Sequence, residues 1–266
     1  MKKDLNGKTA VVTGASSGIG VAFSRELASR GCSLVMISNQ DILAAVAGKI
    51  AREYGVRAYP LFCDLTSDNC VDEIESFLKE EHLAPDFLIN NAGIFSFRLL
   101  TETPEEKINC FIDLHVRAVT MLSRDFAQRF ARQGGGRILN MSSMSCWMPM
   151  PGIAMYSATK SYIRVFSRAL HYEMKDSGVS VTAACPGGIA TDLFGLPENL
   201  KKLAVNIGAL ATPERFVHKA VDKMLKGKKQ YINGLLNRFS IFFVSILPTP
   251  VRMLIKHKML DKGITR

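Results

Sequence analysis

The stretch Thr13-Gly14-Ala15-Ser16-Ser17-Gly18-Ile19-Gly20 joins an apolar run, Thr9–Thr13, to a segment of helical pattern that begins at Gly18. Glycines at such a junction permit a sharp turn, and they let the backbone approach a ligand closely. The first backbone N–H groups of the following helix bind anions well, which suits a pyrophosphate. The stretch therefore predicts a strand-turn-helix unit that holds a dinucleotide, although its spacing differs from the plain G-x-G-x-x-G pattern.

Apolar runs and helical patterns alternate along the chain from this unit onward. This alternation is typical of βαβ units and of a parallel sheet, and 47% hydrophobic residues suffice to bury such a sheet on both faces. We therefore expect one α/β domain over residues 1–233, a doubly wound Rossmann-type sheet, followed by an extension over 234–266. The expected strands are Thr9–Thr13, Ser33–Ser38, Arg57–Cys63, Phe87–Asn90, Gly136–Ser142, Val179–Ala184 and Gln230–Ile232, with helices at 18–30, 41–54, 67–82, 104–132, 153–175 and 213–226.

Tyr156 and Lys160 are four residues apart in one predicted helix, and Ser143 lies thirteen residues before the tyrosine. Residues four apart share a helix face, so the phenol and the ammonium project into one pocket. The positive charge favours the phenolate, and we expect it to lower the pKa of Tyr156 from about 10 towards working pH. A tyrosine of this kind can donate a proton to a carbonyl oxygen or remove one from an alcohol. The pattern predicts a redox enzyme that acts on a C=O/CH–OH couple.

Two further motifs follow the expected order, Asn90-Asn91-Ala92-Gly93 and Pro186-Gly187-Gly188-Ile189-Ala190-Thr191. With them, the chain resembles the short-chain dehydrogenase/reductase family over roughly residues 5–233. The resemblance implies a nicotinamide dinucleotide cofactor and hydride transfer to or from a carbonyl or secondary alcohol. Within the family, the chain is similar in particular to the reductases of ketoacyl chains, keto lipids and hydroxysteroids.

The resemblance also implies roles for single residues. Tyr156 is the general acid and base, Lys160 supports it and binds the nicotinamide ribose, and Ser143 donates to the substrate oxygen. Ser142 is the nearest rival of Ser143, but the thirteen-residue spacing favours Ser143. The fourth catalytic residue of the family is an asparagine, and aligning residues 112–115 with the family pattern puts His115 at its position, whereas Asn109 lies about six residues too early. Whether the imidazole holds or relays a proton, or only packs, is open at this point.

The implied cofactor-binding residues lie at the ends of the predicted strands and on the helix that carries Tyr156. They are Gly14, Ser16, Ser17, Gly18, Ile19, Gly20, Ser38, Asn39, Asp64, Leu65, Asn91, Ala92, Gly93, Tyr156, Lys160, Pro186, Gly187, Ile189 and Thr191.

The end of the second strand decides between the two nicotinamide cofactors. An acidic residue there binds the ribose 2′-hydroxyl of NAD(H) and repels the 2′-phosphate of NADP(H). The sequence has Ser38-Asn39-Gln40 instead, so we expect NADP(H) to be favoured over NAD(H). The arginine that many NADP-dependent relatives carry is also missing, and Ser17 is not basic. An NAD-dependent hydroxysteroid or alcohol dehydrogenase is therefore the alternative.

The predicted substrate loops are apolar and rich in methionine, at 94–97, 144–155 and 193–196. This lining suits a flexible lipophilic substrate, such as a 3-ketoacyl chain, a 3-keto sphingoid base or a steroid. Contact with a partner subunit would explain the same residues, and we expect a homo-oligomer. The alternative from another functional class is a nucleotide-binding scaffold with weak catalysis. Its only support is that His115 stands at the position of the family's catalytic asparagine.

The net charge of +10 comes from residues 198–266, which carry 14 basic against 4 acidic side chains. A basic segment favours contact with something anionic. Aromatic residues are not interleaved with the lysines, so nucleic acid is not the expected partner.

The six cysteines lack Cys-x-x-Cys pairs, and residues 1–7 contain no apolar secretory segment. We therefore expect free thiols, no metal and a cytoplasmic protein.

The extension, residues 234–266, contains an apolar run at 239–247 that is too short to cross a bilayer, which needs about 20 residues. A second segment, 251–260, places apolar residues on one helix face and basic residues mainly elsewhere. This is the pattern of a helix that lies in an anionic membrane surface, and it predicts peripheral membrane contact. Packing over the substrate pocket, or between subunits, would need the same apolar face.

Overall fold

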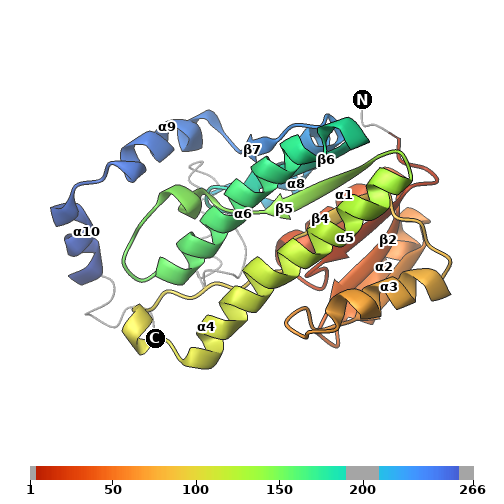
Figure 1. Ribbon diagram of the computed structural model, residues 1–266, viewed down its shortest axis with the longest axis horizontal. Coiled ribbons are helices and arrows are strands. Elements are labelled where there is room, and N and C mark those ends of the chain that lie inside the picture. Colours follow the sequence, from red (N-terminus) through yellow and green to blue (C-terminus); the bar gives the residue numbers. More distant parts are fainter. Residues whose placement is uncertain (1–3, 190–209, 258–266) are drawn as a thin grey trace.

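The computed structural model describes residues 4–189 and 210–257 (Figure 1). A parallel sheet has the strand order β3-β2-β1-β4-β5-β6-β7, and it confirms the predicted doubly wound fold. The strands are β1 Thr9–Thr13, β2 Ser33–Ser38, β3 Ala58–Phe62, β4 Phe87–Asn90, β5 Gly136–Met141, β6 Val179–Cys185 and β7 Gln230–Ile232. The helices are α1 Gly18–Ala28, α2 Leu43–Tyr54, α3 Cys70–Glu80, η1 Leu100–Glu102, α4 Glu105–Ile112, η2 Asp113–Ala118, α5 Val119–Arg132, η3 Met144–Trp147, α6 Ala154–Glu173, η4 Lys175–Ser177, α8 Pro213–Leu225, α9 Leu235–Ser245 and α10 Thr249–Ile255.

Two hydrophobic cores cover the two faces of the sheet. Successive side chains of a strand point to opposite faces, and β1 follows this rule: Ala10 and Val12 belong to one core, Val11 to the other. The first core packs α1, α2 and α8 against the sheet, and the second packs α3, α5 and α6. Because both faces are covered, the inner strands are continuous apolar runs, as the sequence pattern indicated.

The strand order reverses at the centre of the sheet, where β1 lies next to β4 although the two strands are not consecutive in the chain. The chain builds one half of the sheet outward from β1 and the other half outward from β4. A crevice opens between the loops at the carboxyl ends of such strands, and ligands of doubly wound folds bind there. The fold therefore places the glycine loop after β1 opposite the loops that follow β4 and β5.

The long helix predicted at 104–132 is divided into α4, η2 and α5. The middle piece, η2, is a wide turn of π-helix, and it contains the buried residue His115. Such wide turns are rare inside helices and often occur at functional sites. Helical periodicity alone does not reveal them, so the sequence predicted one uninterrupted helix.

Candidate active site

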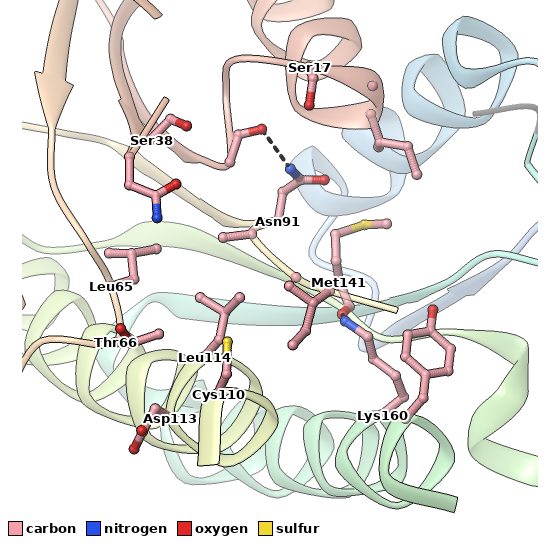
Figure 2. Close-up of a pocket in the computed structure, with 18 of the residues that line it drawn as sticks. Ser17, Ser38, Leu65, Thr66, Asn91, Cys110, Asp113, Leu114, Met141 and Lys160 are labelled. Carbon is pink, nitrogen blue, oxygen red and sulfur yellow. Dashed lines mark hydrogen bonds between the residues drawn. The ribbon is translucent and has the colours of Figure 1, made fainter. Parts of the chain in front are cut away.

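A cavity of about 1090 Å³ runs along the carboxyl ends of the strands, from the glycine loop to Tyr156 (Figure 2). The predicted site residues line it, with three exceptions. Gly20 and His115 lie behind its wall, and Thr191 lies outside the described residues. Figure 2 shows Ser17 and Ser38 across the cavity from Lys160. The chain thus brings together residues that are more than a hundred positions apart in the sequence.

The glycine loop has the shape that a dinucleotide needs. Gly14 and Gly18 have φ angles of +63° and +52°, which favour glycine. A side-chain carbon at Gly20 would overlap the carbonyl oxygen of Gly14 and would lie 2.8 Å from Asn91 Nδ2. The loop and the first turn of α1 are therefore packed backbone to backbone. A pyrophosphate fits this cradle, because Ser17, Gly18 and Ile19 at the start of α1 line the cavity and the Ser17 side chain makes no capping hydrogen bond to the helix.

Asn91 and Thr13 hold the glycine loop in place. Asn91 Nδ2 donates to the carbonyl oxygens of Thr13, at 3.0 Å, and of Gly14, at 3.3 Å; the bond to Gly14 is the dashed line in Figure 2. Thr13 Oγ1 accepts from the backbone N–H groups of Asn91 and Ala92, each at 3.0 Å. Thr13 had no predicted role, although its position at the end of β1, directly before Gly14, was a usable signal. Through these bonds the ends of β1 and β4 are fixed to each other.

A neutral hydrogen-bonded group lies at the end of β2. The hydroxyl of Ser16 donates to Gln40 Oε1 at 2.6 Å, so the hydroxyl of Ser38 donates to Ser16 Oγ at 2.9 Å. Ser38 Oγ also accepts from the backbone N–H of Gln40 at 3.3 Å. Asn39 lines the cavity beside them. Hydroxyl and amide groups thus occupy the place where an acidic residue would select NAD(H).

The catalytic candidates meet at the other end of the cavity. Lys160 Nζ donates to the carbonyl oxygen of Met141 at 2.9 Å and lies 5.7 Å from the centroid of the Tyr156 ring. Ser143 Oγ accepts from the backbone N–H of Ser145 at 3.1 Å. The hydroxyl of Ser142 donates to the carbonyl oxygen of Lys160 at 2.7 Å and ties α6 to β5.

The predicted direction of the Tyr156 pKa shift is wrong. Burial raises the pKa of Tyr156, and the Ser143 hydroxyl, within hydrogen-bonding reach of the phenol, offsets only part of that rise. Burial also lowers the pKa of Lys160 to about 7. The amine is therefore only partly charged near neutral pH, and it points to Met141 rather than to the phenol (Figure 2). Desolvation, which a sequence pattern does not show, outweighs the charge effect expected from the spacing.

His115 joins the end of β4 to the helix that carries Tyr156. The backbone N–H of Ile94 donates to His115 Nε2 at 3.0 Å, so this nitrogen carries no proton. The proton is on Nδ1, which donates to Thr159 Oγ1 at 3.0 Å. Burial, with a smaller contribution from Lys160, lowers the pKa of His115 well below its usual value. The imidazole is therefore neutral, and both of its nitrogens are engaged.

The cavity is also lined by residues to which the sequence gave no binding role. They are Asn109, Cys110, Asp113 and Leu114, from α4 and η2, and Figure 2 shows the last three beside Leu65 and Thr66. In addition, the edge of the Phe95 ring meets the Tyr156 ring, with their centroids 5.0 Å apart. The loop predicted at 193–196 lies outside the described residues.

The extension begins next to the cavity. Asn233 Oδ1 accepts from the backbone N–H of Gly187 at 2.7 Å, and the Asn237 side chain covers Gly187. From there α9 packs against η3, in the loop that follows β5, and Figure 1 shows α9 and α10 beside that loop. Among the described residues, no helix has the length and apolar character needed to cross a membrane.

Comparison with known proteins agrees with this geometry. Residues 8–199 match the family described as short chain dehydrogenase. The very-long-chain 3-oxoacyl-CoA reductase of Anas platyrhynchos is 33% identical over 254 residues, which are 93% of this chain and 78% of that protein. The inactive hydroxysteroid dehydrogenase-like protein 1 of Homo sapiens is 32% identical over 222 residues, 82% of this chain and 66% of that protein.

A solved short-chain dehydrogenase from Sphingobium yanoikuyae, in complex with NADPH, superposes with a TM-score of 0.77 at 29% identity. The superposition covers 88% of this chain and 91% of that one. The family match spans most of the chain, and the cavity contains both the glycine cradle and the Tyr156–Lys160 pair. The chain therefore belongs to the short-chain dehydrogenase family and is an NAD(P)-dependent oxidoreductase.

Proposed function

We propose that this protein uses NADP(H) to reduce the carbonyl group of a lipophilic substrate of the 3-ketoacyl class. One observation carries the proposal: Ser143, Tyr156 and Lys160 gather at one end of a cavity whose other end is a dinucleotide cradle. The avian relative named very-long-chain 3-oxoacyl-CoA reductase supports the 3-ketoacyl class. Ile94, which lines the cavity, and Phe95, whose ring contacts Tyr156, support a lipophilic substrate.

The chemistry follows from the hydrogen bonds around Tyr156. A bound nicotinamide supplies the hydride. Tyr156 donates its proton to the carbonyl oxygen as that oxygen gains negative charge. Ser143 Oγ already accepts from Ser145 N–H, so its own proton is left to donate to the same oxygen. Lys160, with a pKa of about 7, binds the ribose hydroxyls and can return a proton to the phenol at neutral pH.

A screen of purified protein tests this proposal. We expect NADPH oxidation that depends on added 3-ketoacyl thioesters and that becomes more efficient with chain length. A 3-keto sphingoid base, a keto steroid and small ketones belong in the same screen, since they share the carbonyl chemistry. Preference for a small polar ketone over every lipophilic compound would contradict the substrate class while leaving the reaction class intact.

A catalytically weak scaffold is the second candidate, because one human relative carries the word inactive in its name. In this chain the phenol, the amine and the serine hydroxyl all line the cavity. Substrate-dependent NADPH oxidation would dismiss the scaffold, and its absence with every carbonyl compound would favour it.

Cofactor preference gives a separate prediction at Asn39, which is exposed and lines the cavity at the end of β2. We expect NADPH to raise the melting temperature more than NADH does. The near-isosteric change Asn39→Asp adds a carboxylate beside the proposed site of the 2′-phosphate. It should weaken NADPH binding about tenfold or more through charge repulsion and leave NADH binding nearly unchanged. Tighter binding of NADH by the parent protein would overturn the preference.

We also propose that His115 is a positioning residue that fixes α6 to the end of β4. His115→Leu leaves the Ile94 N–H without a partner, and it should lower the free energy of unfolding by about 1–3 kcal/mol. It should also reduce kcat roughly ten- to a hundredfold because Tyr156 is no longer held in place.

His115→Asn is the matched variant, since an amide can accept from Ile94 and donate to Thr159. It should keep most of the stability and most of the activity. Equal melting temperatures and equal kcat values in the parent, His115→Leu and His115→Asn would mean that His115 only fills space in the core.

A further inference from the structure

Helix α9 and the residue that follows it expose four large apolar side chains on one side: Phe239, Phe242, Phe243 and Ile246, here called the stripe. They are 67%, 64%, 64% and 61% exposed, respectively. Positions separated by three, four and seven residues lie on the same side of a helix, so the four side chains form one continuous surface. Single exposed apolar residues are ordinary, but a contiguous surface of three phenylalanines and an isoleucine marks a site of interaction.

The rest of the fold holds this face outward. The helix packs against η3, in the loop that follows β5. Arg252 of α10 donates from Nη1 to the carbonyl oxygen of Pro149 in that loop, at 3.3 Å, and from Nη2 to that of Ser245, at 3.2 Å. Both helices are thus attached to the loop that borders Ser143. Exposed apolar residues continue along α10, where Val251 is 40% and Leu254 is 52% exposed.

The charge around the stripe identifies the kind of partner. Residues 234–257 contain Arg238, Arg252 and Lys256 and no aspartate or glutamate. Arg238 is exposed and lies four residues before Phe242, so it flanks the stripe. A second copy of this chain would bring like charges together across the contact. An anionic lipid surface offers headgroups for the basic residues and hydrocarbon for the rings.

We propose that the stripe of α9 inserts into the interface of an anionic membrane and holds the substrate side of the cavity at that surface. The attachment of α9 and α10 to the loop around Pro149 connects the docked helix with the site. A lipophilic ketone can then reach Tyr156 from the bilayer without crossing water. This last step rests on the proposed function, whereas the docking itself does not.

The test is sedimentation of the full chain with vesicles of phosphatidylcholine, with and without about one third phosphatidylglycerol, at low and high salt. We expect binding to the anionic vesicles that weakens with added salt, since surface attraction is screened over about 8–10 Å at moderate ionic strength. The double variant Phe239→Ser/Phe242→Ser should bind roughly tenfold less tightly or worse. Its exposed positions leave the fold intact, which NADPH binding verifies.

The matched control is Ile42→Ser/Phe62→Ser. These residues are 57% and 62% exposed, and Phe62 lies on β3, at the opposite edge of the sheet from β7 and α9. The control should bind vesicles like the parent. Three results would overturn docking: no binding of the parent to anionic vesicles at low salt, equal binding by the stripe variant, or a dimer that the stripe variant abolishes without any lipid dependence. The last result would assign the stripe to a second copy.

Activity on a short, water-soluble ketone separates failure of docking from failure of the proposed function. If the parent and the stripe variant reduce it equally while neither binds vesicles, the docking proposal alone is wrong. If vesicles bind as expected and no ketone is reduced, the proposed function is wrong and the docking surface remains.

Discussion

The Tyr156→Phe variant loses turnover by a factor of about a thousand or more, while its affinity for NADPH stays within about twofold of the parent. This is the largest effect that we expect. The change removes the proton that passes to the carbonyl oxygen, and such proton transfer contributes roughly 10²–10⁴ to a rate. It removes little volume and leaves the buried ring in contact with Phe95. Steady-state rates and a NADPH titration measure the two quantities.

Tyr162→Phe is the control for this variant. Tyr162 lies on the same helix, α6, but outside the cavity lining, and its hydroxyl bonds to Thr120 Oγ1 at 2.7 Å. The same chemical change there should leave turnover nearly unchanged. If Tyr156→Phe kept a tenth of the parent activity, another acid would protonate the substrate and the assignment of Tyr156 would fail.

The Lys160→Met variant should lose activity about a hundredfold or more and yet fold into a more stable protein. Activity falls because the amine that supports the phenol and the ribose is gone. Stability rises because the lysine is fully buried, and burial lowers its pKa from 10.5 to about 7. The gain at neutral pH is on the order of 3 kcal/mol, after the loss of the hydrogen bond to Met141 is subtracted.

The dependence on pH makes this prediction specific. Between pH 7 and 10.5 the folded protein binds fewer protons at Lys160 than the unfolded chain does. The stability of the parent therefore rises with pH across this window. The advantage of Lys160→Met is largest at pH 7 and below, and it shrinks towards pH 10.5.

Chemical denaturation of the cofactor-free proteins at several pH values measures this difference. Lys49→Met, at an exposed position of α2, should show no such trend. A constant difference between Lys160→Met and the parent at all pH values would contradict the account of Lys160.

The sequence predicted the fold because its signals are local and repeated. Each strand is a short apolar run, and each helix between strands buries one face, as in α1 with Phe23 and Leu27. The glycine positions were equally visible, since Gly14 and Gly20 are needed for close backbone contact. The positions of Ser143, Tyr156 and Lys160 on the cavity wall agree with their spacing, while their catalytic roles stay predictions.

Other features depend on contacts that no local pattern records. The pKa of Tyr156 is set by burial between α6 and the loop after β4, so spacing alone gave the wrong direction. His115 is neutral because Ile94 and Thr159, from two other segments, occupy its nitrogens. For α9, the apolar run was plain in the sequence. Which of its faces packs against η3, and which stays exposed, becomes visible only in the assembled fold.

In the proposed reaction, Tyr156 protonates a substrate carbonyl while hydride arrives from NADPH in the same cavity. Mass spectrometry of the product tests it, with NADPH deuterated at the transferred position and a long-chain 3-ketoacyl thioester as substrate. We predict one deuterium on the new carbinol carbon with the parent and with Tyr162→Phe, and about a thousandfold less labelled product in the same time with Tyr156→Phe. Equal amounts of deuterated product from Tyr156→Phe and the parent, or NADPH binding without a labelled alcohol from any carbonyl compound tested, would contradict this mechanism.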